Sequence, residues 1–529
     1  MPKVASRPLI STFQVQRFDG GLNLRDAPTE IAPNETPDCM NVTLDERGGA
    51  ESRLGITKLN GASLLPAAPS YLYYSTVAAA LLAYIPTVTA AGRLYKSTNG
   101  GVTWSEVTWT PGPPQFTAGA AAAIIDFKNR VVVVNTLDGV YSFPSDLSLP
   151  TRTTGGAANM EEVRGSAIAV WQNKLLVTGD IREDATHSQA RVWASNAGNE
   201  QLWTVATAFI DIRDVDTKIC TAIGAGVGMD VTGKPTLLVF KETSMYRMND
   251  PTSLAYTTLH SKGAGAACAT AIASNLGRIC SINREGIWVT DGLAIPIRVS
   301  DKLQPLFSAD GIDYANFSKW TAAPYRDRVC FNIVRAGASA PNLMLEYHPE
   351  LGWAVPHKLS LGPMAPYTKQ TAKLISVSSG AGGEVYETFK GGTDDTVAIP
   401  ARYQTPWVPL ANGDEARLRY LRAFGRGTIS AQLREDFAAV GEDYTLAFNQ
   451  GFGFVWDVDL WDVGLWGDPA IEGNADTPLD EVCAHVSLML SASTTSSVTK
   501  TALLGDGNAP EIGAWAVYGV KLDYIQLGT

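Results

Sequence analysis

The sequence has few of the residues and patterns on which metal binding and redox catalysis usually depend. Its 529 residues include only 6 cysteines and 5 histidines. The cysteines occur without a CxxC pair, and the histidines occur without an HxH or HExxH pattern. Zinc sites and thiol redox sites need such close spacing. The sequence therefore predicts no metal centre and no cofactor, and it predicts buried, reduced thiols in a protein that folds in a reducing cytosol.

Long apolar runs and basic runs are also missing. The most apolar stretch, residues 71–85, is interrupted by Ser75 and Thr76 and is too short for a membrane span. The first residues lack the continuous apolar core of a signal peptide. Charged residues make up 18% of the chain, its net charge is −11, and no segment is rich in Lys and Arg. We therefore expect no membrane span and no tight binding of nucleic acid through phosphate neutralisation.

Helical periodicity is scarce, whereas turn residues are abundant. The 49 glycines and 29 prolines separate short runs that are rich in Val, Ile, Thr, Tyr and Trp. This composition is typical of many short strands joined by tight turns. Apolar residues make up 45% of the chain, and the chain is longer than a domain with a single hydrophobic core usually is. The sequence therefore predicts an all-β protein of two or three domains.

A strand–turn–strand unit recurs through residues 61–395. The units follow one another at roughly 45 residues, the length of a four-stranded propeller blade. Runs such as Val131 to Val134 are apolar throughout, as inner strands covered on both faces require. The repeat predicts a β-propeller of six or seven blades, and a sandwich of hairpins is the alternative. The seven candidate strand pairs are 81–85 with 93–95, 130–135 with 139–141, 173–178 with 191–193, 236–240 with 244–246, 277–281 with 286–288, 328–332 with 343–347, and 372–376 with 384–386.

Residues 97–104, Ser-Thr-Asn-Gly-Gly-Val-Thr-Trp, resemble the Asp-box, with Asn99 in the place of the aspartate. We expect Ser97 to open a hairpin turn in which the Asn99 side chain caps backbone N–H groups. Gly101 is expected to take a positive φ, and Trp104 is expected to fill the base of the turn. The Asp-box marks blade hairpins in sialidases and in many unrelated propellers. It therefore indicates a fold and not a reaction.

Two segments flank the repeats. Residues 1–60 are interrupted by prolines and by two Gly-Gly pairs, which exclude a long helix. We expect an extended N-terminal arm that packs either on the rest of the molecule or on a neighbouring subunit. Residues 396–529 contain alternating strands, such as 417–422. They are expected to form a C-terminal antiparallel β-domain of sandwich type.

Three sets of residues resemble the propeller-bearing tail proteins of tailed bacteriophages. The first set is Phe18-Asp-Gly-Gly-Leu-Asn with Pro33-Asn-Glu, Asn41 and Arg53-Leu-Gly, the second is Arg191-Val-Trp-Ala-Ser-Asn-Ala-Gly with Trp203, and the third is the Trp-Asp cluster of residues 452–466. Among these proteins, the chain is most similar to the nozzle (tail tube B) of short-tailed phages. The resemblance implies a structural virion protein of the tail, made in the cytoplasm of the bacterial host.

The same resemblance implies a set of partners. The nozzle-like proteins form a homo-oligomeric, hexameric ring that is part of the conduit for DNA ejection. Such a ring contacts other tail proteins, on the adaptor or portal side and at the fibres. Genome DNA is expected to pass through the ring without tight binding, because each neutralised phosphate would add affinity and slow the DNA.

Other functions have weaker support in the sequence. The first alternative is a tail hub or a propeller that binds a receptor or a glycan, and the second is a carbohydrate-active enzyme. Asp457, Asp459 and Asp462 fit calcium ligands or a glycosidase pair, but they alternate with apolar residues, which favours carboxylates that face solvent. Residues 228–235 match the start of a P-loop, but Pro235 stands where Ser or Thr would bind Mg²⁺. We therefore predict no catalytic residue and a protein that is not an enzyme.

Overall fold

The computed structural model divides the chain into two compact units. The propeller unit comprises Lys58–Glu350 and Lys358–Thr388, and the terminal unit comprises Met1–Thr57, Leu351–His357 and Phe389–Thr529. Three parts were expected, namely an arm over residues 1–60, a propeller over 61–395 and a domain over 396–529. The structure instead groups the N-terminal and C-terminal segments together. The described residues are 10–45, 48–89, 91–109, 116–152, 159–204, 207–213, 218–229, 235–249, 257–369, 372–380, 382–411, 414–448, 473–494, 498–499, 511–512 and 516–526.

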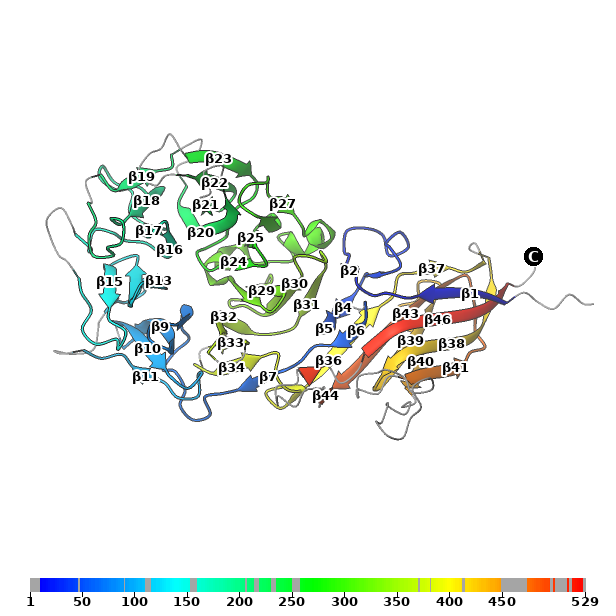
Figure 1. The fold of residues 1–529 in the computed structure, drawn as a ribbon. Coiled ribbons are helices and arrows are strands. Elements are labelled where there is room, and N and C mark those ends of the chain that lie inside the picture. The colour runs from blue at the N-terminus through cyan, green and yellow to red at the C-terminus, as the bar shows by residue number, and fades with distance from the viewer. Residues whose placement is uncertain are drawn as a thin grey trace, which may run out of the picture. The chain divides into compact units, whose positions relative to one another are not determined.

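The propeller unit consists of antiparallel sheets that follow one another around a ring (Figure 1). The first strand of each sheet contacts the first strand of the next, and β32 contacts β8, so seven sheets of described residues close the ring. The expected propeller of six or seven blades is confirmed. The strands are β8 (Tyr71–Ser75), β9 (Ala80–Val88), β10 (Ala91–Ser97), β11 (Ser105–Glu106) and β12 (Phe116–Thr117); β13 (Ala122–Phe127), β14 (Arg130–Asn135) and β15 (Gly139–Phe143); β16 (Ala167–Trp171), β17 (Lys174–Thr178), β18 (Arg191–Ala194) and β19 (Phe209–Asp211); β20 (Cys220–Met229), β21 (Pro235–Lys241), β22 (Ser244–Met248) and β23 (Thr257–Lys262); β24 (Ile272–Asn275), β25 (Arg278–Asn283), β26 (Gly286–Thr290) and β27 (Ile297–Arg298); β28 (Thr321–Tyr325), β29 (Arg328–Ile333) and β30 (Leu343–Tyr347); and β32 (Leu361–Tyr367), β33 (Lys373–Ser378) and β34 (Val385–Thr388).

All seven strand pairs expected from the sequence are paired in the structure. They form the second and third strands of the seven sheets, from β9 with β10 to β33 with β34. Two short 3₁₀ helices, η2 (Asp301–Phe307) and η3 (Tyr314–Lys319), lie between the fifth and sixth sheets in chain order. The sequence signal was strongest at the second and third strands because neighbouring sheets cover them on both faces.

Strand β14 shows why its run of valines is continuous. All four side chains from Val131 to Val134 are fully buried. Val131 and Val133 pack in a cluster with Leu82 and Tyr84 of the first sheet. Val132 and Val134 pack in a second cluster with residues of the third sheet. Because alternate residues point to opposite faces of a strand, one apolar run contributes to the cores on both sides of its blade.

The chain segment before the first blade closes the ring. Leu59 N donates to Val385 O at 2.8 Å, and Leu65 N donates to Gly383 O at 3.1 Å. The side chain of Asn60 accepts from Val385 N at 3.0 Å and donates to Gly383 O at 2.9 Å. The segment thus runs along β34, the third strand of the last sheet. Buried residues of the first and last blades then share one apolar cluster.

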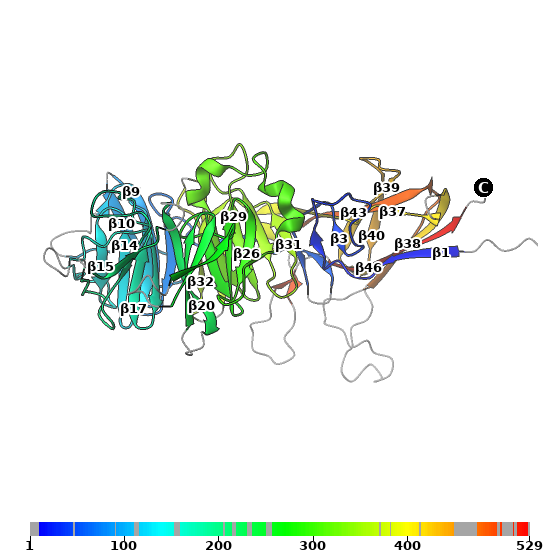
Figure 2. The same cartoon turned by 90° about the horizontal axis from the view of Figure 1, so that it is seen from above.

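The terminal unit contains two mainly antiparallel sheets of β-sandwich type (Figure 2), and in the second sheet β7 and β35 pair in parallel. The first sheet has β41 (Gly473–Pro478), β38 (Ala416–Arg426), β46 (Ala516–Gln526), β6 (Ala50–Ser52) and β5 (Val42–Leu44), with β1 (Ile10–Val15) and β42 (Val482–Cys483) at its sides. The second has β7 (Ile56–Lys58), β35 (Thr393–Asp394), β36 (Val397–Gln404), β43 (His485–Thr494), β39 (Thr428–Glu435) and β40 (Glu442–Ala447), with β37 (Val408–Pro409) and β4 (Cys39–Met40). Three further short elements are β2 (Gly21–Leu22) with β3 (Glu35–Thr36), β44 (Val498–Thr499) with β45 (Glu511–Ile512), and β31 (Ala354–His357).

The N-terminal segment is extended, as expected, and its strands pair with strands from the end of the chain. β1 pairs with β46 from Ile10–Ile525 to Val15–Val520, and Figures 1 and 2 show the two strands side by side. β6 also pairs with β46, and β4 pairs with β36. The sequence left open whether the arm packs on its own chain or on a neighbouring subunit. In the structure it packs on its own chain. Packing on a neighbouring subunit stays a prediction.

Candidate functional site

The Asp-box residues form the turn between β10 and β11. Ser97 Oγ donates to Asn99 Oδ1 at 2.9 Å, and Asn99 Oδ1 also accepts from Thr103 N at 3.0 Å. Gly101 N donates to Ser97 Oγ at 2.9 Å, and Gly101 has a φ of +99°. Trp104 Nε1 donates to Gly101 O at 3.0 Å. The geometry therefore follows the turn expected from the motif, with Asn99 as the capping side chain.

This turn lies at the point where the propeller ring closes. A Cβ atom at Gly101 would lie 3.2 Å from Cγ1 of Val385, on the last blade, and 3.5 Å from Cδ1 of Leu59. Trp104 is half-buried and packs against the apolar cluster that the first and last blades share. The motif therefore stabilises the ring closure, and its residues are held by contacts within the fold.

The Arg53-Leu-Gly55 motif forms a buried junction in the terminal unit. The Arg53 side chain is fully buried, and its guanidinium contacts both carboxylate oxygens of Asp394, at 2.8 Å for Nη1–Oδ1. Its Nε donates to Asn41 Oδ1 at 3.0 Å. A Cβ atom at Gly55 would lie 1.9 Å from Thr393 O, so only glycine fits there. The junction fastens the strand that precedes the propeller unit in sequence to the strand that follows it.

The Phe18 motif is packed in the same unit. Phe18 is fully buried and contacts Tyr403 edge to face, with 5.3 Å between the ring centroids. Asn23 is buried, and its Nδ2 donates to Glu35 Oε2 at 2.7 Å. Gly21 has a φ of +74°, and an added Cβ would lie 2.9 Å from Trp353. These residues therefore fix the course of the N-terminal segment.

The second set of resembling residues lies in the third blade. Arg191 forms a bidentate ion pair with Asp211, at 2.7 Å for Nε–Oδ1, and its guanidinium lies 3.7 Å from the ring centroid of Phe209. Trp193 and Trp203 are buried, and Trp203 Nε1 donates to Glu200 O at 2.8 Å. The ion pair and the stacked ring stabilise the outer edge of this blade.

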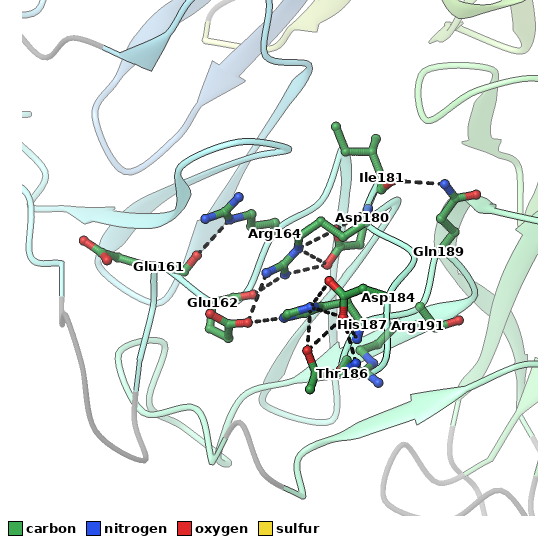
Figure 3. Close-up of polar contacts among 12 residues, drawn as sticks. Glu161, Glu162, Arg164, Asp180, Ile181, Asp184, Thr186, His187, Gln189 and Arg191 are labelled. Atoms are coloured by element: carbon green, nitrogen blue, oxygen red, sulfur yellow. Dashed lines mark hydrogen bonds and ion pairs between the residues drawn. The ribbon is translucent and has the colours of Figure 1, made fainter.

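A polar cluster extends from Arg191 to the hairpin between β17 and β18 and to residues 159–166 (Figure 3). Asp180 is fully buried and receives both Nε and Nη2 of Arg182, with 2.6 Å for Nη2–Oδ2. Arg182 Nη1 donates to Glu162 Oε1 at 3.0 Å, and its Nη2 donates to Glu162 O at 2.6 Å. Arg191 Nη1 donates to Thr186 O at 2.7 Å. The two arginines thereby hold the hairpin at both of its ends.

His187 lies between two carboxylates of this cluster (Figure 3). Its Nε2 contacts Glu162 Oε1, and its Nδ1 lies 2.9 Å and 2.8 Å from the two carboxylate oxygens of Asp184. Thr186 Oγ1 is 3.0 Å from Nδ1 and 2.8 Å from Asp184 Oδ1. Both ring nitrogens therefore face negatively charged partners, and each is already occupied within the protein.

These contacts lower the pKa of both carboxyl groups. Burial by itself would raise the pKa of Glu162, but the hydrogen bond from His187 and the charge of Arg182 outweigh it and lower the pKa below its usual value. The pKa of Asp184 is lowered by the backbone N–H of Thr186, then by His187 and the Thr186 hydroxyl. Hydrogen bonds to the charged form of an acid have this effect. The two groups are therefore carboxylates at neutral pH.

The cluster was not foreseen from the sequence. His187 was one of the isolated histidines, and only the spacing of Asp184 to His187 could have suggested a local pair. Glu162 stands 25 residues before His187, and no pattern in the sequence connects the two. With both ring nitrogens bonded to carboxylates, His187 has no free nitrogen for a substrate, which argues against a general acid or base here.

A cavity lies near the starts of several inner strands of the propeller unit. It has a volume of about 210 Å³. Its lining includes Ser70, Thr270, Lys319, Thr321, Gly362 and Ser378, together with alanine and proline residues. Thr321 begins β28, and Ser378 ends β33. The cavity is therefore formed by the ends of strands and by their connecting loops at one face of the ring, where loops that bind ligands usually lie.

Some residues singled out in the sequence lie outside the described part of the chain. Asp457, Asp459 and Asp462 do so, with the rest of the Trp-Asp cluster. In residues 228–235, Pro235 begins strand β21, whereas the P-loop motif requires a helix. Among the described residues, no three or more His, Cys, Asp or Glu side chains are grouped as a metal ion would need. No helix in the described ranges has the length and apolarity needed to cross a membrane.

Comparison with known proteins gives matches among solved structures alone. No family model and no curated protein matches it. Among solved structures, it is similar to a computationally designed protein named Ika8, with 12% identity and a TM-score of 0.35, over 63% of this chain and 99% of that chain. A similarity of that size carries no argument. What is established for this chain is an all-β fold with a β-propeller, and that rests on its own strand pairing.

Proposed function

We propose that the protein is a structural subunit of a bacteriophage tail, similar to the nozzle of short-tailed phages, and that it is not an enzyme. The observation that carries the proposal is the role of the resembling residues in the fold. Arg53, Gly55 and Phe18 fasten the terminal unit, and Arg191 and Trp203 stabilise one blade. Residues that resemble those of a structural family, and that hold the fold together here, support a structural role.

The order of the units along the chain also supports this proposal. In the sequence, both segments of the propeller unit lie between the N-terminal and C-terminal segments of the terminal unit, and the short third segment of the terminal unit, Leu351–His357, separates them. The terminal unit is a β-domain made from both chain ends, with its own buried core. The resemblance to nozzle proteins implies a hexameric ring in which propellers lie on the outside of a tube. The net charge of −11 suits a conduit through which DNA slides without being held.

Electron microscopy of the purified full-length protein tests the proposal. We expect rings with a central opening and a mass of six subunits in native mass spectrometry. We expect no DNA binding at physiological salt. A monomer at all concentrations, or tight and salt-sensitive DNA binding, would contradict the nozzle-like function.

The cavity of the propeller unit favours one second candidate, a propeller that binds a receptor glycan. Ser70, Ser318 and Ser379 are among the residues that line it, and serine hydroxyl groups can bond sugar hydroxyls. Binding of wild type on a glycan array, with loss of binding in Ser70→Ala, would favour this candidate. Ser70 is exposed, and Val102→Ala, at another exposed position of the propeller unit, serves as a control.

A further inference from the structure

One sheet of the terminal unit has two free edges. Four of its strands lie side by side in the order β1, β46, β38 and β41, and Figure 1 shows β1 and β41 on opposite sides of the other two. One row across these strands consists of Gln14, Lys521, Arg422 and Asp476. Among the described strands, β1 pairs only with β46, and β41 pairs only with β38. The outer edges of β1 and β41 therefore present backbone N–H and C=O groups that no described strand bonds.

The directions of the four strands make these two edges complementary. Each neighbouring pair is antiparallel, so β1 runs parallel to β38 and antiparallel to β41. When β41 of one copy is placed beside β1 of the next, the two strands are antiparallel and the alternation continues across the contact. Pairing of two β1 strands would also be antiparallel, but it would leave β41 free in both copies. The same sheet in a second copy is thus the partner that continues this sheet regularly.

Strand β1 has none of the features that usually protect a free edge. Its sequence, from Ile10 to Val15, contains no charged residue and no proline. By contrast, the outermost strands β11, β19 and β27 of three blades have only two or three residues. Proteins keep free edges apart by charge, by proline or by short length. Because Ile10 is also 61% exposed, the edge of β1 has the properties of an interface.

Strand β41 can receive β1 without a conflict of charge. Both strands have six residues. Asp476 of β41 lies 3.8 Å from Arg422 of β38, which offsets its charge. Pro478 is the last residue of β41, so the residues before it keep their backbone N–H groups. On the same face of β1, Thr12 and Gln14 are exposed and uncharged, so the contact brings no like charges together.

We propose that β1 of one copy of this chain pairs with β41 of the next, so that the sheet continues from subunit to subunit. Such a head-to-tail contact closes into a ring or continues as a filament. A closed ring leaves no free edge, which removes the risk of further association. The inference rests on the proposed function for closure at six subunits, whereas the pairing of the two edges does not depend on the size of the ring.

Disulfide cross-linking of the full-length protein tests the pairing. Within one chain, β1 and β41 are three strand spacings apart, about 14 Å, whereas a disulfide needs Cα atoms within about 7 Å. Gln14→Cys/Asp476→Cys can therefore form a disulfide only between copies. Ile10→Cys and Thr12→Cys, each combined with Asp476→Cys, cover the other registers on the same face. We expect at least one of the three double variants to give a ladder of linked chains after mild oxidation with diamide, and reduction should abolish the ladder.

Two variants and the wild type serve as controls. In Gln14→Cys/Arg422→Cys the second cysteine is on the same face but one strand further in, so no ladder should form. Gln14→Cys alone should give no linked dimer, and a dimer would overturn the proposal because two β1 strands would then pair with each other. The wild type reports on the six natural cysteines, five of which are buried. The substituted positions 14, 422 and 476 are exposed, and hydrogen exchange of β38 and β46 verifies that each variant is folded.

Native mass spectrometry of the wild type distinguishes this inference from the proposed function. Rings of six subunits without a ladder in any double variant would agree with the proposed function and overturn the pairing of β1 with β41. A ladder from open filaments, without rings of six, would support the pairing and contradict the nozzle-like function. A protein that stays monomeric and gives no ladder would overturn both.

Discussion

The two units differ in how far apart their interacting residues lie along the chain. In the propeller unit, each sheet is built from strands that follow one another directly. In the terminal unit, Ile10 pairs with Ile525, and Arg53 bonds Asp394. Local pairing lets each blade form from one short stretch of sequence, whereas the terminal unit needs both of its distant segments in place. The terminal unit should therefore be the more sensitive of the two to a single broken contact.

The largest effect is expected at the Arg53 junction. Arg53→Ala leaves Asp394 and Asn41 without their buried partner and should lower the stability of the terminal unit by about 3–5 kcal/mol. Hydrogen exchange should show loss of protection in β5, β6 and β36 and unchanged protection in β14. Arg402→Ala is the matched control, because the Arg402–Asp38 pair is exposed, and its effect should stay below about 1 kcal/mol. Equal loss of protection in both units would show that the terminal unit is no more sensitive to a broken contact than the propeller unit.

The same difference explains what the sequence could predict of the fold. The second and third strands of all seven blades were predicted, because their apolar runs are consecutive and face two cores, as Val131 and Val132 do. The grouping of the chain ends was not predicted. Nothing in the sequence around Ile10 indicates that its partner, Ile525, lies 515 positions later in the chain. The prolines and glycines of the first 60 residues correctly indicated an extended chain but could not identify its partners.

The candidate sites divide in the same way. The Asp-box was predictable in detail because Ser97, Asn99 and Thr103 bond one another within a single turn. The Arg53 junction and the Glu162–His187 contact were not, because each joins residues from separate segments. A charged side chain in a sequence gives no indication of the partner that will bury it. The sequence identified motifs, and the structure was needed to pair them.

The second largest effect is expected at the ring closure. Trp104→Ala removes a half-buried ring from the cluster shared by the first and last blades and should cost about 2–4 kcal/mol, less than a fully buried tryptophan. Chemical denaturation followed by tryptophan fluorescence and circular dichroism measures the change. Val102→Ala, at an exposed position of the same turn, should be nearly neutral. If Trp104→Ala melted like the wild type, the turn would have no part in closing the ring.

A smaller effect of opposite sign is expected at Asn99. In the wild type, the Ser97 hydroxyl and the Thr103 backbone N–H both donate to the amide oxygen of Asn99. In Asn99→Asp, they would donate to a carboxylate oxygen. The Thr103 hydroxyl, which now accepts from Asn99 Nδ2, can turn and donate. Because charge-assisted hydrogen bonds are stronger than neutral ones, the variant should stabilise the propeller unit by about 0.5–1 kcal/mol. Asn99→Ala should destabilise it by a similar amount, and a lower melting temperature for both variants would show that the amide itself is required.

The smallest effect is a dependence of the stability of the terminal unit on pH, and it concerns Glu435, at the end of β39. Burial, followed by the charges of Glu481, Asp436 and Glu442, raises the pKa of Glu435 to about 7. The folded state therefore binds a proton more tightly than the unfolded state between about pH 4 and pH 7, and stability decreases as the pH rises through that range. Because the side chain is partly exposed, we expect an effect of only about 0.5 kcal/mol.

Glu435→Gln should remove this dependence on pH. Relative to the wild type, the variant should be more stable at pH 8, where the buried negative charge is lost, and nearly equal at pH 4, where the wild-type carboxyl is protonated. Hydrogen exchange of β39 and β43 at the two pH values measures the difference in the terminal unit. Glu415→Gln, at an exposed position of the same unit, should be neutral at both. A gain in Glu435→Gln that is the same at pH 4 and pH 8 would mean that packing, and not charge, sets the stability at the end of this strand.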